Sequence, residues 1–188
     1  MMDYQTAVRG AFFDIAGVAE TPDEVAAQAR YLDDGLLFLQ EGKIIALLPW
    51  QEGEAFLHPL KGYVDLRGKL LLPGFVDTHI HYPQTEMIGA FGEQLLEWLT
   101  TYTFPVESQF ADAEYAQEIA QFFVNQLISH GTTTALVFCT LHPASVEALF
   151  SEALRLNMRL IAGKVMMDRH VPCLLYTSPS PRDPKTSR

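Results

Sequence analysis

The feature that most constrains the fold of this chain is the run Pro73-Gly74-Phe75-Val76-Asp77-Thr78-His79-Ile80-His81. The stretch Lys69–Val76 is nearly all apolar, which is typical of a strand buried on both faces, as in a parallel sheet. Side-chain direction alternates along a strand, so we expect the imidazoles of His79 and His81 to point to one side and reach one metal ion. An isolated His-x-His pair usually has no such role, so the prediction depends on its context.

That context is an alternation of helices and strands. Asp112 is predicted to cap a helix that ends at Gly131, which fits the C′ position. A strand over Thr132–Cys139, a helix over Ala144–Leu156 and a strand over Leu160–Met167 follow. This order predicts a parallel α/β fold, and in an α/β barrel the catalytic groups lie at the carboxyl ends of the strands.

Residues 1–68 predict a small β domain instead. The expected elements are strands over Ala7–Ile15, Gly35–Gln40, Lys43–Leu48 and Tyr63–Leu66, with one helix from Pro22 to Arg30. Thr21 and Glu24 form a capping-box pattern for that helix, and Glu41-Gly42 signals a hairpin. We therefore expect three regions: 1–68, a β domain; 69–172, the first βα units of a barrel; and 173–188, a tail.

Composition excludes several classes of partner. The formal net charge of −10 disfavours nucleic acid and anionic membranes. No apolar run reaches the roughly 18 residues of a spanning helix, and no secretory signal is evident. The cysteines, Cys139 and Cys173, are far apart, which favours a reducing compartment and predicts a cytoplasmic protein.

The run that ends in His79 and His81 resembles the metal-binding signature of the amidohydrolase superfamily. Within that superfamily, several segments resemble the guanine deaminases: His81-Tyr82-Pro83-Gln84, Leu96-Glu97-Trp98-Leu99, Tyr102-Thr103-Phe104-Pro105-Val106-Glu107 and Gly163-Lys164-Val165-Met166-Met167-Asp168-Arg169. The resemblance covers residues 7 to 170, with a departure at His170, where Asn is expected. It implies a TIM-type (β/α)8 barrel, here about three strands, preceded by a small β-sandwich segment.

The resemblance also implies a reaction and a site. The reaction is the zinc-dependent hydrolysis of guanine to xanthine and ammonia by a homodimer with one Zn²⁺ per subunit. His79 and His81 are the implied metal ligands, and His81 and Gln84 contact the substrate. The Gln84 amide offers donors and an acceptor, which suits the edge of guanine. The general acid/base and the other metal ligands are implied to come from later in the chain, so we assign no catalytic residue here.

Other polar and aromatic residues receive structural interpretations. Glu86, Glu93, Glu97 and Glu107 are interpreted as helix or loop charges, and His58 and His130 have no assigned role. His142, in a strand-to-helix loop, is an alternative pocket residue. Trp98, Tyr102 and Phe104 are expected to pack in a core, with a lid over the purine as the alternative.

Two other hypotheses stay open. The first is a different aminohydrolase of the same superfamily; a cytidine-deaminase type is disfavoured because its His-x-Glu and Pro-Cys-x-x-Cys motifs are absent. The second is a non-catalytic short protein that binds a metal or a partner. The segment Cys173–Asp183 matches the translation of a transposon-end sequencing adapter, so we interpret the tail as artefactual, with a natural flexible tail as the alternative. Because a barrel takes roughly 250 residues, we expect the 188-residue chain itself to be an inactive fragment that folds poorly.

Overall fold

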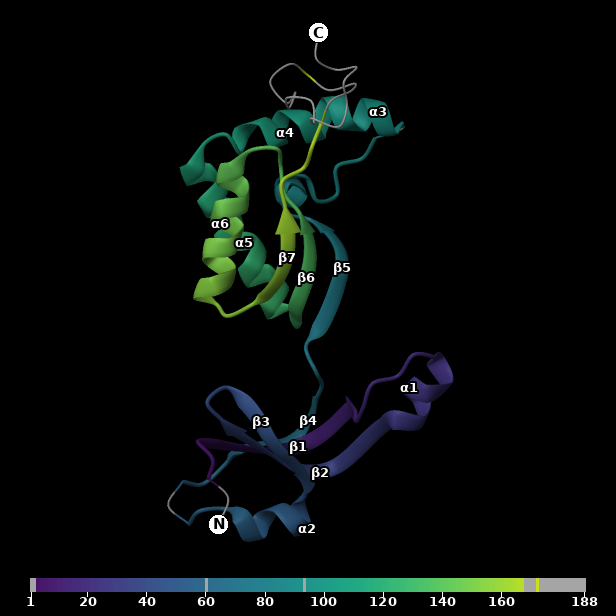
Figure 1. The fold of residues 1–188 in the computed structure, drawn as a ribbon, viewed down its shortest axis with the longest axis vertical. Helices are drawn as coiled ribbons and strands as arrows, with labels where there is room; N and C mark the ends of the chain where they lie inside the picture. Colours follow the sequence, from purple (N-terminus) through teal and green to yellow (C-terminus); the bar gives the residue numbers. More distant parts are fainter. Residues whose placement is uncertain (1–2, 60, 93, 168–171, 173–188) are drawn as a thin grey trace. The chain divides into compact units, whose positions relative to one another are not determined.

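The computed structural model describes residues 3–59, 61–92, 94–167 and 172. The chain forms two compact units, Met1–Pro73 and Gly74–Arg188 (Figure 1). The expected tail, 173–188, and the departure at His170 lie outside the described residues. Among the residues described, no helix is long and apolar enough to cross a membrane.

The first unit is built on a four-stranded sheet in the order β3-β2-β1-β4. Its strands are β1 (Thr6–Ile15), β2 (Ala29–Gln40), β3 (Lys43–Pro49) and β4 (Val64–Leu71). Neighbouring strands are antiparallel except for β1 and β4, which are parallel. The unit also holds α1 (Pro22–Gln28), α2 (Trp50–Gly53) and the 3-10 helix η1 (Glu54–Phe56). Buried Tyr4, Ala7, Leu36 and Phe38 form its core.

The local signals in this unit are confirmed. Thr21 caps α1 in a complete capping box with Glu24. Glu41 and Gly42 both have positive φ, 48° and 72°, as the turn of the β2–β3 hairpin requires. The helix ends at Gln28 instead of Arg30, because Arg30 belongs to β2 and forms an ion pair with Asp14 of β1.

The second unit is a parallel sheet in the order β5-β6-β7 with helices on one face (Figure 1). Its strands are β5 (Phe75–His81), β6 (Thr132–Phe138) and β7 (Arg159–Gly163), joined through α5 (Ala113–Ser129) and α6 (Pro143–Arg155). Between β5 and α5 lie η2 (Tyr82–Met87), α3 (Leu95–Trp98), η3 (Leu99–Thr103) and α4 (Phe104–Gln109). The predicted α/β class and the order of its elements are confirmed.

The core of this unit lies between the sheet and the helices α5 and α6. Ala135 and Val137 of β6 are buried against α5 and α6, whose buried side chains include Phe123 and Leu149. Leu136, on the opposite face of β6, is 37% exposed. Within the described residues, the sheet is therefore covered on its helical face and open on the other.

The expectation of one buried strand over Lys69–Val76 is wrong. Lys69–Leu71 belongs to β4 and pairs with β1, whereas β5 begins at Phe75 in a different sheet. Pro73-Gly74 separates the two strands, since proline cannot donate a ladder hydrogen bond. Phe75 and Val76 are 56% and 64% exposed, because β5 is an edge strand of the three-stranded sheet.

Candidate metal and substrate site

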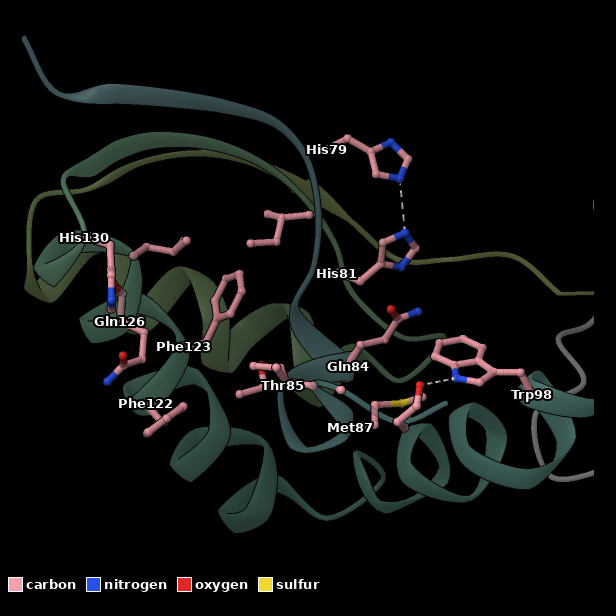
Figure 2. Close-up of a pocket in the computed structure, with 15 residues that line it drawn as sticks. His79, His81, Gln84, Thr85, Met87, Trp98, Phe122, Phe123, Gln126 and His130 are labelled. Carbon is pink, nitrogen blue, oxygen red and sulfur yellow. Dashed lines mark hydrogen bonds between the residues drawn. The ribbon is translucent and has the colours of Figure 1, made fainter. Parts of the chain in front are cut away.

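The two histidines of β5 lie at the carboxyl end of the parallel sheet. In the ladder with β6, Asp77 pairs with Ala135 and Ile80 pairs with Val137, so β5 holds one extra residue between these pairs. Such a β-bulge commonly re-aims a side chain next to a functional site. Ile80 packs against the helical core, and the imidazoles of His79 and His81 lie together on the other side of the strand (Figure 2).

The two imidazoles face each other through their Nε2 atoms, which are 3.3 Å apart. Two nitrogen ligands of a tetrahedral zinc ion, each at about 2.05 Å, stand about 3.3 Å apart. This spacing, at which the two rings share a hydrogen bond, is also compatible with two ligands of one ion. Burial, and next the neighbouring His79, lower the pKa of His81, which favours the neutral ring.

A phenylalanine that the sequence analysis did not single out supports this pair. Phe138, the last residue of β6, pairs in register with His81. Its ring centroid lies 4.9 Å from that of His79 and 4.8 Å from that of His81. Within the bulged segment of β5, the Asp77 carboxylate accepts a hydrogen bond from the His79 backbone N–H at 3.0 Å. The position of Phe138 at the end of a predicted strand was the only sequence signal for it.

Gln84 lies in η2, three residues after His81. Figure 2 shows its amide and the Trp98 indole on the same side of β5 as the two imidazoles. All four residues line a cavity of about 640 Å³. The structure therefore brings His79, His81 and Gln84, the three residues singled out from the sequence, to one cavity.

This cavity extends around the free edge of β5. Its wall on the helical side includes Phe122 and Phe123 of α5, and Phe122 is 52% exposed. His130, which caps the carboxyl end of α5, also lines it. No strand of the described residues pairs with this edge of β5, so the cavity is lined both by the two histidines and by side chains that face the helices.

The aromatic residues of the η2–α4 region divide between core and cavity. Phe104 is 7% exposed, as the packing interpretation expects, whereas Tyr102 is 37% exposed. The Trp98 indole N–H donates to the Ala90 carbonyl at 3.1 Å and lines the cavity. Trp98 therefore holds the loop after η2 at the wall of the cavity.

Two further buried polar groups are not among the residues that line the cavity. The backbone of His142 is held by Thr140 and Ser145, while its Nε2 atom is buried with no hydrogen-bond partner among the described residues. Glu107 of α4 is 5% exposed and its Oε2 atom likewise has no partner in the described part of the chain. Burial raises the pKa of Glu107 to about 7, so it is not the ordinary surface charge that its sequence context predicts.

The described residues supply only part of a metal centre. In ranges 3–59, 61–92, 94–167 and at 172, no three His, Cys, Asp or Glu side chains are grouped to hold an ion. A catalytic zinc ion usually has three protein ligands and an open position. The His79–His81 pair is a candidate for two of these ligands.

Residues 70–188 match the model of the amidohydrolase family. The chain is 54% identical over 166 residues to the guanine deaminase of Escherichia coli K12, an alignment that covers 88% of this chain and 38% of that protein. The solved structure of E. coli guanine deaminase matches with a TM-score of 0.87 and 53% identity over 92% of this chain and 40% of the other. Guanine deaminase from C. acetobutylicum, solved with guanine in its active site, matches with a TM-score of 0.73, 28% identity and coverages of 92% and 39%. The chain thus spans about two fifths of the length of these relatives.

Proposed function

This chain belongs to the amidohydrolase family, and from that premise we propose that the complete protein catalyses the hydrolytic deamination of guanine to xanthine and ammonia. The observation that carries the proposal is the meeting of His79, His81 and Gln84 at one cavity. Its support from relatives is the 54% identity to a guanine deaminase. Since the chain covers 38% of that relative, the activity is proposed for the whole protein and not for this segment alone.

The metal part of the proposal assigns one Zn²⁺ to the His79–His81 pair. The support is the 3.3 Å spacing of the two Nε2 atoms, which fits two ligands of a tetrahedral ion. The remaining ligands would come from residues beyond those described. A bound zinc ion supplies Lewis acidity that makes a water molecule nucleophilic near neutral pH.

In the proposed reaction, the residues of this chain would bind the metal ion and the purine. His79 and His81 present their Nε2 atoms 3.3 Å apart, and the Phe138 ring packs against both imidazoles. Gln84 presents two N–H donors and one carbonyl acceptor to the edge of the purine, and His81 borders the same space. No group among them is placed to shuttle the proton to the leaving ammonia, so we assign that step to a residue outside this segment.

The first experiment tests the metal pair in the complete protein that carries this segment. His79→Ala and His81→Ala should each lower the bound zinc well below one per subunit and lower guanine turnover at least about 100-fold. His58→Ala, in the first unit, is the matched control and should keep both values. Full zinc content and full turnover in the double variant would exclude the proposed site.

The second experiment tests substrate recognition. Gln84→Ala should lower kcat/KM for guanine about tenfold or more at unchanged zinc content, because donors and an acceptor to the purine edge are lost. Turnover of adenine, cytosine and triazines by the parent protein tests the alternative of another aminohydrolase in this family. Preference for one of these over guanine would replace the proposed substrate.

The remaining expectations are parts of the same proposal. We propose that the complete protein is cytoplasmic and forms a homodimer. Light scattering of the complete protein tests the homodimer. The hypothesis of a non-catalytic short protein predicts instead that the 188-residue chain alone melts cooperatively and that no longer reading frame encodes it. Resequencing the DNA beyond the codon for Pro172 distinguishes the two.

A further inference from the structure

The turn that carries Gln84 is held at both ends by one helix. Tyr82 begins η2, and its hydroxyl donates to the Ala116 carbonyl of α5 at 2.5 Å. Glu86, near the other end of η2, accepts a hydrogen bond from the Tyr115 hydroxyl of α5. We call these two hydrogen bonds, Tyr82–Ala116 and Glu86–Tyr115, the turn clasp. Gln84 lies midway between its two points of attachment.

An aromatic stack links the two halves of the turn clasp. The Phe110 ring packs edge-on against Tyr82, with centroids 5.0 Å apart, and edge-on against Tyr115, with centroids 5.1 Å apart. Tyr82 and Phe110 are fully buried. The Thr85 hydroxyl also donates to the Tyr82 carbonyl at 2.7 Å, within the turn itself. The backbone around Gln84 is therefore fixed by contacts that Gln84 does not make.

The helix that anchors the turn is itself capped at this point. The Asp112 carboxylate accepts from the backbone N–H groups of Glu114, at 2.8 Å, and Tyr115, at 3.3 Å. Tyr115 and Ala116 thus belong to a first helical turn whose free donors are satisfied. Burial, and next the hydrogen bond to Glu86, raise the pKa of Tyr115, so its hydroxyl stays protonated and continues to donate to the carboxylate.

We propose that the turn clasp positions Gln84 for recognition of the purine, so that Tyr115 and Glu86 are positioning residues of the reaction; this inference rests on the proposed function. Gln84 is half-buried at the edge of an open cavity, and no hydrogen bond holds its own amide among the contacts of the described residues. Its placement therefore depends on the backbone of η2. Precise placement matters because a misplaced substrate-binding group loses much of its effect on rate.

The test is a double-variant cycle in the complete protein. Tyr115→Phe removes the Tyr115–Glu86 hydrogen bond of the turn clasp and Glu86→Gln weakens the same bond, so each should lower kcat/KM for guanine about tenfold. Zinc content should stay at the parent value. The matched control is Tyr31→Phe, which removes the exposed hydrogen bond from Tyr31 to Asp33 in the first unit and should leave kcat/KM unchanged.

Repeating Tyr115→Phe in the Gln84→Ala variant distinguishes a clasp that positions Gln84 from one that only stabilises the fold. If the clasp acts through Gln84, Tyr115→Phe should cause less than a twofold further loss in that background. A full tenfold further loss, or an effect of Tyr115→Phe no larger than that of Tyr31→Phe, would overturn the inference while leaving the proposed function intact. A parent protein that does not convert guanine overturns the proposed function, and the inference with it.

Discussion

The imidazole of His81 lies nearly parallel to the ring of Phe138, with 4.8 Å between the ring centroids and 14° between their planes. The two residues also pair across the β5–β6 ladder. Backbone pairing and ring packing together limit the rotation of the imidazole. The ring orientation is therefore determined by a neighbouring strand and not by β5 alone.

The first prediction concerns this packing. Phe138→Ala should raise the dissociation constant for zinc about tenfold in the complete protein. Imidazoles that can rotate freely lose more conformational entropy when they bind the ion. Chelator competition measures the constant. Phe150→Ala on α6, where Phe150 is 37% exposed, is a matched control for loss of an aromatic ring. Equal zinc affinity in the two variants would show that Phe138 has no part in metal binding.

The second prediction concerns Glu107 and pH. Its folded-state pKa of about 7 lies above its ordinary value of 4.5, so burial disfavours the charged form. The protonated side chain is tolerated at pH 5, and stability is lost as the pH rises through 7. Glu107→Gln removes this titration, and its stability relative to the parent should improve by about 2 kcal/mol between pH 5 and pH 8.

Denaturant titrations of the parent and of Glu107→Gln at both pH values measure this difference. Glu147→Gln on α6, an exposed position, serves as the control and should show no such improvement. A stability difference that does not depend on pH would mean that Glu107 ionises freely or has a cationic partner in the complete protein.

The third prediction concerns the cap of α5. Asp112→Ala removes the acceptor for two backbone donors and should destabilise the protein by about 1 kcal/mol, and Asp112→Ser should restore most of the loss. Thermal unfolding measures both effects. If the turn clasp depends on this helix end, Asp112→Ala should also raise KM for guanine. Equal stability of the alanine and serine variants would contradict a capping role.

The fourth prediction concerns Cys139. The residue is 1% exposed, and burial raises the pKa of its thiol to about 11. Only about one thiol in a thousand is then ionised at pH 8, so iodoacetamide should label Cys139 at least about 100-fold more slowly in the folded protein than in denaturant. Peptide mapping by mass spectrometry follows this site specifically. Rapid labelling under native conditions would show that the core around β6 opens.

The sequence predicted the local elements well where the signal is carried by neighbouring residues. The capping box at Thr21, the turn at Glu41-Gly42 and the cap at Asp112 each depend on contacts within a few positions, and each is confirmed. The apolar stretch Lys69–Val76 was misread for the same reason. Hydropathy does not show that a chain leaves one sheet at Pro73-Gly74 and enters another.

For the site, residue type and spacing along the chain predicted the candidates: two histidines at a strand end and a glutamine three positions later. The β-bulge that brings the two Nε2 atoms to 3.3 Å, the packing of Phe138 against the imidazoles and the attachment of the Gln84 turn to α5 are visible only in the folded structure. The physical reason is that residue type and spacing along one strand are local properties. Ring orientation and the burial of Glu107 arise from atoms contributed by segments far apart in the chain.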